Sequence, residues 1–335
     1  MWPNSFIFAL YNLKGMRFRA LALCFAILLG FCFRSTAQIT GASCPESAKY
    51  YAKDSVNVVT FGASTVAGVN GLDFQSYLTT NFLNCYTGKT INVQKYGVAG
   101  ETTAKGLLRI DNAIFGKTGF IVILMGANDA LDIEAGKQKI AETEANMRTF
   151  IVKSLNQNLV PIVCTLQNFD DRQDARLRRA NVQVRLINDI YKKLVKEYNI
   201  YLADINAVIR RDFTLYQDAI HPNARGNRLI SFVLFDTINK IIAERFLQFV
   251  VTQNYPNPSR DLTSVDIVMP ASDKIEFKIY NLQGKVVQTV LNEYLNTGKH
   301  TVQLDLHYLS PGIYIYKIVS SSGQYSATKK MIVVR

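Results

Sequence analysis

The sequence predicts an α/β protein with three α/β/α layers around a parallel five-stranded sheet, followed by a small all-β sandwich. From residue 56 to about residue 247, short runs rich in Val, Ile and Leu alternate with longer stretches of helical spacing. This alternation is typical of a parallel sheet between two helical layers. After residue 253 only strand-like segments remain, in which apolar and polar residues alternate. The chain is therefore predicted to contain two domains of different architecture.

The predicted parallel sheet consists of five short apolar segments. Nearly continuous apolar composition is expected of strands that are buried on both faces. The segments are residues 56–61, 91–95, 120–125, 160–166 and 200–203. In open α/β sheets, ligands bind outside the carboxyl ends of the strands. The loops that follow these segments are therefore the place to look for a functional site.

Three longer segments have the residue spacing of amphipathic helices. They are residues 136–155, 175–198 and 223–247. In the second of them, Val182, Leu186 and Ile190 recur every four residues, which places them along one helix face. Because these segments separate the predicted strands, they are expected to form the crossover connections of the parallel sheet.

The N-terminal residues 1–37 are predicted to be a secretory signal peptide. Lys14, Arg17 and Arg19 precede an apolar run of 14 residues, and Ser35–Ala37 supplies small residues before a cleavage site. The alternative is a membrane anchor, but the apolar run is short for a bilayer-spanning helix. Met16 is a second candidate for the start of the chain, in which case residues 1–15 are not translated.

The boundary between the two predicted domains lies near Gln253. Pro256 and Pro258 lack a backbone donor and restrict the residue before each of them, so no helix continues here. We therefore predict an α/β domain at residues 38–250, a linker at 251–261 and the β sandwich at 262–335.

The net charge of the chain is +12, and 12 − 4 leaves +8 after removal of the four basic residues of the signal peptide. No run of Lys and Arg is interleaved with aromatic residues. We therefore interpret the excess charge as a solvated basic surface and expect no nucleic acid as a partner.

Three of the five cysteines, Cys44, Cys85 and Cys164, lie outside the signal peptide. An odd number excludes complete pairing within the chain. Cys164 belongs to an apolar strand-like segment and is expected to be a buried free thiol. Cys44 and Cys85 remain as candidates for a disulfide.

Three residues with catalytic chemistry lie at the ends of predicted elements. Ser64 follows the first strand, in a tight turn. Asp218 precedes His221 by three residues, so its carboxylate reaches the imidazole Nδ1–H and leaves Nε2 free to act as a base. Taken alone, Ser64 is a common turn residue, and His221 is a surface histidine beside the helix cap Asn223. A metal site needs three or four ligands, and no second His or Cys pair stands near His221.

Two further residues follow the second and third predicted strands. In the loop 97–102, Gly100 allows a bare backbone N–H to approach a ligand. Asn128 is expected in a loop after the third strand, where its amide is able to face a developing oxyanion. Each feature alone also fits an ordinary turn. We interpret Glu101 as a first-turn carboxylate of a helix that extends through Leu107.

In order and spacing, these blocks resemble the SGNH hydrolase superfamily, also called GDSL-like esterases and lipases. The resemblance implies that Ser64 is the nucleophile, that His221 is the base and that Asp218 orients it. It also implies an oxyanion hole in which the backbone N–H groups of Ser64 and Gly100 act together with the side-chain amide of Asn128. The family needs no metal or cofactor for this chemistry.

The resemblance covers about residues 56–247 and implies the same three-layer α/β/α fold. One departure is that Ala63 stands where the motif usually has Asp, a residue outside the catalytic three. The implied function is an exported serine esterase that hydrolyses an acetylated carbohydrate or another short-chain carboxylic ester. The alternatives are a lysophospholipase or lipase of the same fold and a non-catalytic surface protein that binds carbohydrate. The loops 66–74 and 166–176 are expected to form the walls of the acyl pocket.

The C-terminal region resembles the sorting domain of the type IX secretion system. The resemblance lies in residues 254–258, residues 312–317 and the Lys329–Lys330 end, and it spans about residues 254–335. It implies that the type IX secretion machinery is a partner and that the protein crosses the periplasm and outer membrane to the cell surface or the medium. An accessory carbohydrate-binding sandwich is the alternative. We expect the protein to be a monomer.

Overall fold

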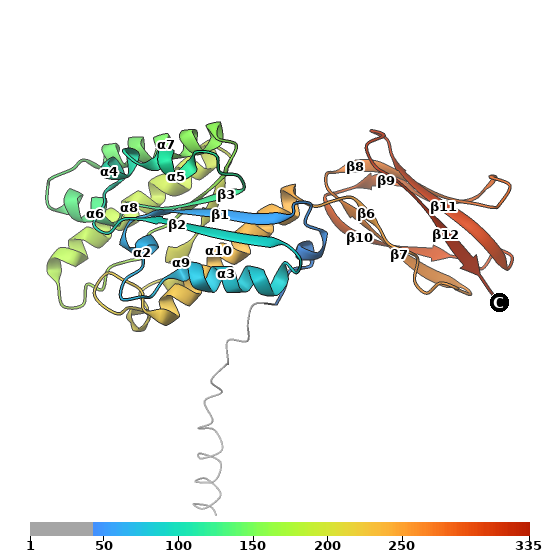
Figure 1. Cartoon of the computed structure of the whole chain (residues 1–335), viewed down its shortest axis with the longest axis horizontal. Helices are drawn as coiled ribbons and strands as arrows, with labels where there is room; N and C mark the ends of the chain where they lie inside the picture. Colours follow the sequence, from blue (N-terminus) through green and yellow to red (C-terminus); the bar gives the residue numbers. More distant parts are fainter. Residues whose placement is uncertain (1–42) are drawn as a thin grey trace, which may run out of the picture. The chain divides into compact units, whose positions relative to one another are not determined.

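The computed structural model describes residues 43–335, and the predicted signal peptide lies outside the described residues. The described chain contains an α/β region, which ends with α10 (Ala224–Arg245), and an all-β region, which starts with β6 (Val250–Val251) (Figure 1). Within residues 43–335, no helix combines the length and the apolar character that crossing a membrane requires.

The α/β region is built on a parallel sheet with the strand order β2-β1-β3-β4-β5. Its strands are β1 (Ser55–Gly62), β2 (Thr90–Gly97), β3 (Phe120–Leu124), β4 (Val160–Cys164) and β5 (Tyr201–Ala203). All residues of β3 and β4 are buried, in agreement with their continuous apolar composition. The chain passes from β1 to β2 on one side and returns to β3 on the other. The carboxyl ends of β1 and β3 therefore flank the point where such sheets bind ligands.

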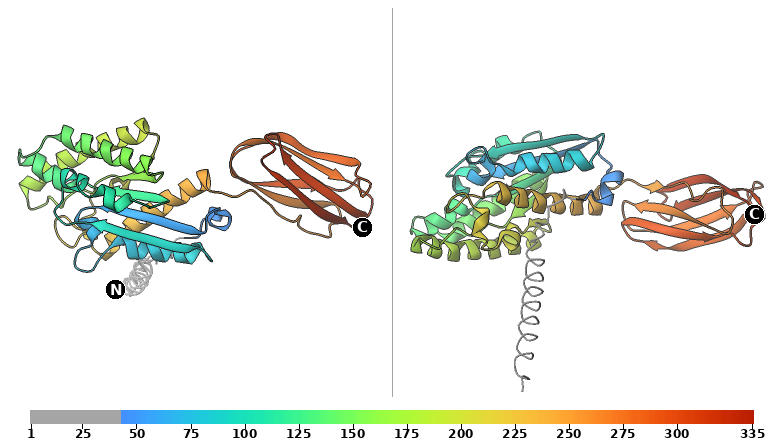
Figure 2. Two further views of the ribbon diagram at one scale, coloured as in Figure 1. Left: turned by 45° about the horizontal axis from the view of Figure 1, so that its top comes forward. Right: turned by 90° about the horizontal axis from the view of Figure 1, so that it is seen from below.

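Helices cover both faces of this sheet, which confirms the predicted three-layer fold (Figures 1 and 2). On one face lie α3 (Phe74–Cys85), α9 (Ile205–Ile209) and α10. The opposite face carries α4 (Thr103–Leu107), α5 (Ile110–Ile114), α7 (Ile140–Asn156) and α8 (Ala175–Glu197). Helices α7, α8 and α10 correspond to the three predicted amphipathic segments. The predicted apolar face of α8 was wrong, because Val182 and Leu186 are exposed, whereas Val184, Ile187 and Tyr191 are buried.

Helix α3 was not predicted from the sequence, because Ser, Thr and Asn dominate its solvent side and have low helix propensity. Its apolar face is nevertheless regular, since Phe74, Leu78 and Phe82 recur every four residues and are fully buried. The side chain of Asp73 caps the helix by accepting a hydrogen bond from the N–H of Ser76 at 2.8 Å. Packing and capping therefore stabilise this helix more than intrinsic propensity does.

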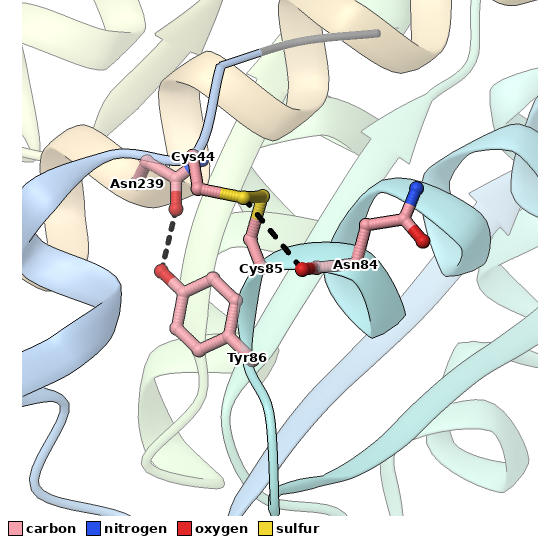
Figure 3. The surroundings of a disulfide bond; sticks show 5 residues. All are labelled: Cys44, Asn84, Cys85, Tyr86 and Asn239. Carbon is pink, nitrogen blue, oxygen red and sulfur yellow. Dashed lines mark hydrogen bonds between the residues drawn. A yellow bond between two sulfur atoms is a disulfide. The ribbon is translucent and has the colours of Figure 1, made fainter.

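Cys44 and Cys85 form a disulfide, so the pairing that the cysteine count left open is present (Figure 3). Their Cα atoms are 5.1 Å apart, and the bond joins the start of the described chain to the end of α3. Next to it, the buried Tyr86 hydroxyl donates a hydrogen bond to Asn239 of α10. Cys164 is a buried free thiol, as predicted, and burial raises its pKa.

The all-β region consists of two antiparallel sheets with the strand orders β10-β7-β6 and β12-β11-β8-β9. Its further strands are β7 (Leu262–Met269), β8 (Asp273–Tyr280), β9 (Val286–Leu295), β10 (Gly298–Asp305), β11 (Gly312–Ser320) and β12 (Ser326–Val333). In β8, Ile275, Phe277 and Ile279 are fully buried, whereas the residues between them are partly exposed. Residues of both sheets share one apolar core, which confirms the predicted sandwich.

The segment 251–261, predicted to be a linker, is hydrogen-bonded to the sandwich. β6 pairs with β7, and Tyr255 exchanges two backbone hydrogen bonds with Ser264, at 2.9 and 3.0 Å. The N–H of Asn254 donates to the hydroxyl of Tyr316 at 3.0 Å. Prolines end a helix but favour extended backbone before them, and extended backbone is able to pair with a strand. By these contacts the segment is part of the sandwich and not a free connection.

Candidate active site

Ser64 lies at the carboxyl end of β1, where it is the first residue of the short helix α2 (Ser64–Ala67). The helix packs directly on the sheet because Gly97, at the end of β2, has no side chain. A Cβ atom at Gly97 would overlap the backbone nitrogen of Ala67. The N–H of Ser64 belongs to the first helical turn, whose N–H groups have no acceptor within the helix. This leaves the Ser64 amide suited to bind an external oxygen.

His221 lies beside Ser64, although 157 positions separate the two residues in the sequence. The distance from His221 Nε2 to Ser64 Oγ is 2.9 Å. His221 Nδ1 faces Asp218 at 2.9 Å from Oδ2 and 3.1 Å from Oδ1. The structure therefore brings the three residues together in the order hydroxyl, imidazole and carboxylate.

The Asp218 carboxylate is held in the ionised form by its surroundings. Burial raises its pKa, but hydrogen bonds from the backbone N–H groups of His221 and Ile220 and from the imidazole lower the pKa more. The backbone bonds measure 2.7 Å from His221 and 2.8 Å from Ile220. The resulting pKa lies below the ordinary value of an aspartate, so the carboxylate is negatively charged at neutral pH.

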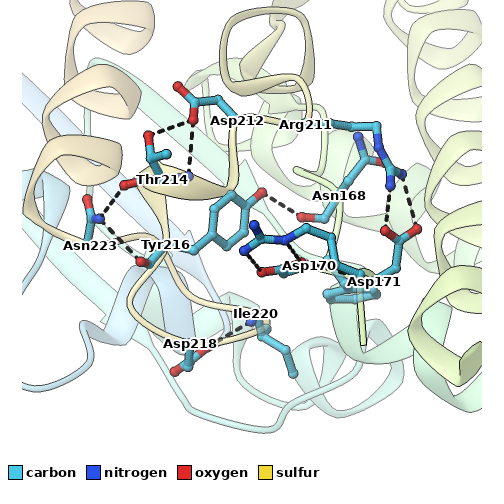
Figure 4. A network of polar contacts seen from close by, with 12 residues as sticks. Asn168, Asp170, Asp171, Arg211, Asp212, Thr214, Tyr216, Asp218, Ile220 and Asn223 are labelled. Carbon is cyan, nitrogen blue, oxygen red and sulfur yellow. Dashed lines mark hydrogen bonds and ion pairs between the residues drawn. The ribbon is translucent and has the colours of Figure 1, made fainter. Parts of the chain in front are cut away.

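The loop that carries Asp218 and His221 is supported mainly by side-chain hydrogen bonds (Figure 4). Asn223 caps the first turn of α10 with its side-chain oxygen, as predicted. Its side-chain amide donates to the carbonyl oxygens of Thr214 at 2.9 Å and Tyr216 at 3.2 Å. One asparagine thus links the start of α10 to the chain segment that leads into Asp218.

Further contacts connect this loop to the segment after β4. The hydroxyl of Tyr216 donates to the carbonyl oxygen of Asn168. The backbone N–H of Asp170 donates to the carbonyl oxygen of Ala219 at 2.8 Å. Figure 4 shows the side chain of Tyr216 pointing toward Asn168, with which it forms this hydrogen bond.

Asp171 and Arg211 form an ion pair between the same two segments (Figure 4). Both guanidinium amino groups contact the carboxylate, and Asn181 donates to it at 3.1 Å. The Asp171 side chain is buried. The hydrogen bonds from Arg211 lower the pKa of Asp171 and outweigh the effect of burial. The pair therefore stabilises the packing of the loop on the segment after β4.

Two asparagines of α8 bind the backbone of the segment after β4. Asn188 accepts from the N–H of Leu166 at 2.7 Å and donates to its carbonyl oxygen at 2.9 Å. Asn181 does the same with Phe169, at 2.8 and 2.9 Å. Because each side-chain amide satisfies both backbone groups of one residue, this segment keeps a defined path without strand pairing.

Ser64, Gly100, Asn128 and His221 line one cavity of about 350 Å³. Its apolar walls include side chains from both predicted loops, from the end of β3 and from the loop that carries His221. These are Val69, Leu124, Leu166, Phe169 and Ile220. Gly100 has a φ of +76°, a conformation that glycine adopts readily. Four of the five candidate residues thus share one cavity, and the fifth, Asp218, contacts His221.

Asn128 lies in the first turn of a helix, α6 (Ala127–Glu134), and not in a loop as predicted. The helix begins directly after Gly126, whose φ of +116° makes the sharp turn from β3. The side-chain amide of Asn128 donates to the carbonyl oxygen of Glu101 at 2.8 Å. This bond joins the start of α6 to the segment that carries Gly100.

The interpretation of Glu101 as a first-turn carboxylate was wrong. Helix α4 begins only at Thr103, with Thr102 as its N-cap, although it ends at Leu107 as predicted. The Glu101 carboxylate instead forms an ion pair with Arg109, at 2.6 Å between Oε2 and Nη2. Because the helix starts two residues later, Glu101 lies outside its first turn.

Asp129 is a residue of this site whose importance sequence reasoning missed, since it also fitted a simple turn. Its side chain is fully buried. The carboxylate accepts hydrogen bonds from the N–H of Thr103 at 2.9 Å, from Gln138 at 2.8 Å and from Thr143 at 3.1 Å. A buried carboxylate requires such partners, and the position of Asp129 five residues after the end of the buried β3 was the available signal. Through its hydrogen bond with Thr103, Asp129 connects the start of α4 to α6.

Comparison with known proteins assigns the chain to a family. The model of the GDSL-like Lipase/Acylhydrolase family matches residues 60–229, half of the chain. The chain therefore belongs to this family and is a hydrolase of the esterase and lipase type. Residues 253–334 match the secretion system C-terminal sorting domain, which directs the protein through type IX secretion to the cell surface or the medium. No curated protein matches the chain.

Several solved structures are similar to about half of the chain. The acetyl xylan esterase AlAXEase is 18% identical, with 54% of this chain and 98% of that chain covered and a TM-score of 0.47. Axe2, an acetylxylan esterase from Geobacillus stearothermophilus, is 19% identical. The match covers 55% of this chain and 94% of that chain, with a TM-score of 0.46. A GDSL-like lipase from Bacteroides thetaiotaomicron VPI-5482 is 16% identical. The match covers 55% of this chain and 88% of that chain, with a TM-score of 0.46. Similarities at this level define neither substrate nor mechanism.

Proposed function

We propose that the protein is an exported serine esterase in which Ser64 is the nucleophile. The main support is the 2.9 Å distance between Ser64 Oγ and His221 Nε2, with the Asp218 carboxylate on the other ring nitrogen. A base within hydrogen-bond reach of a hydroxyl, oriented by a third group, is the arrangement that activates a serine. In this proposal residues 38–250 carry the hydrolysis and residues 262–335 carry the export signal.

In the first half of the reaction, Ser64 Oγ forms a bond to the carbonyl carbon of the ester while its proton passes to His221 Nε2. The Asp218 carboxylate stabilises the imidazolium that results. The imidazolium then donates this proton to the alcohol oxygen as the carbon–oxygen bond of the ester breaks. The alcohol leaves, and the acyl group remains bound to Ser64.

In the second half, water attacks the acyl carbon and gives a proton to His221 Nε2. The bond between the acyl carbon and Ser64 Oγ breaks, and the imidazolium returns the proton to this oxygen. The carboxylic acid leaves and the enzyme is restored. His221 therefore acts as base and then as acid in each half.

In both halves, attack on the carbonyl carbon places a negative charge on the carbonyl oxygen. We propose that this oxyanion binds the N–H groups of Ser64 and Gly100 and the side-chain amide of Asn128. Asn128 donates to the carbonyl oxygen of Glu101. An amide has two N–H donors, so the second is available to the cavity. Removal of one such donor typically costs about 3 kcal/mol of transition-state stabilisation.

The cavity supports a short acyl group as the preferred substrate. Its volume of about 350 Å³ is near the lower end of the usual range of roughly 300 to 1,000 Å³ for ligand sites. Its walls are mainly apolar, which suits the acyl group of an ester. We propose an acetylated carbohydrate or a similar short-chain ester as the substrate.

The test is hydrolysis of p-nitrophenyl esters of increasing chain length by the wild type and by Ser64→Ala. We expect the highest kcat/KM with acetate or butyrate and a loss of about 10⁴-fold or more in Ser64→Ala. A fluorophosphonate probe should label Ser64 of the wild type, as located by mass spectrometry. Undiminished turnover by Ser64→Ala would refute the mechanism. A preference for long acyl chains would refute only the substrate proposal and favour a lipase.

A further inference from the structure

Arg109 connects three segments that surround the candidate active site. It precedes α5, and its side chain is 21% exposed. The guanidinium donates to the carbonyl oxygens of Gly62 at 2.8 Å and Tyr96 at 3.0 Å. Its Nε donates to the carboxylate of Glu101 at 2.7 Å. One side chain thus satisfies two backbone acceptors and one carboxylate.

The three acceptors belong to segments that carry proposed functional groups. Gly62 is the last residue of β1 and lies two positions before Ser64. Tyr96 is the next-to-last residue of β2, and Glu101 directly follows Gly100. The nucleophile segment and the segment of the Gly100 amide are therefore tied to the same guanidinium.

The position requires the properties of arginine rather than of any cation. The guanidinium lies over the ring of Phe61, at 4.3 Å from the ring centroid. A planar fork with five N–H donors is able to stack on a ring and to reach three acceptors in different directions. A lysine ammonium is a compact point charge without this geometry. The side chain of Glu101 is 14% exposed, and its carboxylate balances the positive charge of the Arg109 guanidinium.

Glu101 also contacts Asn128, the third proposed oxyanion donor. Its carboxylate contacts Arg109, while its carbonyl oxygen accepts the hydrogen bond from Asn128. Glu101, the residue directly after Gly100, is thus held between the arginine and the asparagine. Any shift of Glu101 would change the distance between the Gly100 amide and the Asn128 amide.

We propose that Arg109, together with Glu101, is a positioning residue for the oxyanion hole. This inference rests on the proposed function. Arg109 is not among the residues that line the cavity, so its effect passes through the Gly100 segment. Oxyanion donors stabilise the transition state more than the bound ester, so their displacement lowers kcat and leaves KM nearly constant.

The test is Arg109→Lys in the full exported chain, with p-nitrophenyl acetate as substrate. We expect kcat to fall about 10- to 100-fold and KM to change less than about threefold. The rate of fluorophosphonate labelling should fall in parallel, while the pH profile keeps its shape because His221 and Asp218 lie on another segment. An unchanged kcat in this variant would overturn the proposal.

The matched control is Arg148→Lys, in an arginine with a side chain that is 30% exposed. Arg148 pairs with Glu144 and Glu197 and lies 5.9 Å from the ring centroid of Tyr198. Neither Arg148 nor any of these partners lines the Ser64 cavity. We expect this variant to keep the wild-type kcat. Equal losses of kcat in both lysine variants would mean a general loss of stability and would overturn the positioning role.

A second variant covers the case in which Arg109→Lys does not fold. Glu101→Gln keeps the side-chain length and an acceptor oxygen but removes the charge. We expect it to fold and to lower kcat about three- to tenfold, again without a matching change in KM. An unaltered kcat here would also contradict the proposal.

Ser64→Ala, measured in the same series, separates this inference from the proposed function. If Ser64→Ala stays active, Ser64 is not the nucleophile, and the proposed function is refuted. If Ser64→Ala is inactive while folded Arg109→Lys and Glu101→Gln remain fully active, only the positioning role fails.

Discussion

The candidate active site has two halves that are built in different ways. The half with Ser64, Gly100 and Asn128 lies at the ends of β1, β2 and β3, and β1 pairs along its length with β2 and over its second half with β3. The half with Asp218 and His221 lies on an irregular loop, whose regular pairing is a single bridge. In the first half, backbone hydrogen bonds of the sheet define positions, whereas in the second half individual polar side chains do so.

This difference suggests unequal sensitivity to substitution. Many backbone hydrogen bonds hold a strand end in place, so the loss of one side-chain contact moves it little. The loop depends on the contacts of Tyr216, Asn223 and Asp171, each of which a single substitution removes. When a residue that makes a single supporting hydrogen bond is changed, the loop half should therefore lose activity more readily than the strand half. Arg109 is the exception in the strand half, because its one side chain contacts three acceptors at once.

The largest effect in the loop half is expected from Asp218→Asn, which should lower kcat by about 10³- to 10⁴-fold. The amide is able to keep the acceptor bonds to the backbone of Ile220 and His221. It is not able to stabilise the imidazolium, and it permits the wrong tautomer of His221. Steady-state hydrolysis of p-nitrophenyl acetate, with a thermal melt to confirm folding, measures the change. A loss below tenfold would mean that the backbone alone orients the imidazole.

A direct comparison of the two halves uses Tyr216→Phe and Tyr191→Phe. The Tyr216 hydroxyl binds the carbonyl oxygen of Asn168 in the loop half, and the Tyr191 hydroxyl binds that of Met125 at 2.9 Å beneath the strand half. Each variant should lose about 1 kcal/mol of stability in urea unfolding. We expect kcat to fall about five- to tenfold in Tyr216→Phe and less than about twofold in Tyr191→Phe. Equal losses of kcat would contradict the distinction between the halves.

The smallest effect concerns the pH dependence of stability in the loop half. The pKa of Asp171 lies below its ordinary value of 3.8 because of the hydrogen bonds from Arg211. A carboxyl whose pKa is lower in the folded state contributes stability above the unfolded pKa and loses it as the pH falls through the folded pKa.

Asp171→Asn should therefore be less stable than the wild type by about 1 to 2 kcal/mol at pH 7. The difference should begin to shrink as the pH falls below about 4, where the carboxyl of the unfolded chain becomes protonated, and should be lost as the pH falls through the lower pKa of the folded state. Urea unfolding at pH 7, 5 and 3.5 gives the comparison. A difference that stays constant over this range would show that the ion pair with Arg211 does not stabilise the loop.

Much of the fold was predictable because its signals are short in range. Continuous apolar runs predicted the buried parallel strands, and alternation in residues 275–279 predicted the sandwich. Helix α3 escaped prediction because its polar side chains hide a regular apolar face. The pairing of residues 250–255 with β7 was not predicted, because prolines reveal where a helix stops but not which strand the extended segment then joins.

The sequence by itself determined the local chemistry of the candidate site. Asp218 and His221 are three residues apart, so their contact needs only one turn of chain, and Asn223 caps the helix that follows. Ser64 follows a strand whose composition already requires burial. Such features are set by the conformations of neighbouring residues and are visible without knowledge of the rest of the molecule.

The tertiary structure alone decided which distant segments meet. It placed His221 Nε2 against Ser64 Oγ across 157 positions, and it gave Glu101 the partner Arg109 in place of a helix terminus. It also turned the Asn128 amide toward the Gly100 segment. Long-range partners depend on how whole elements pack, and packing is a property of the folded chain that no short window of sequence contains.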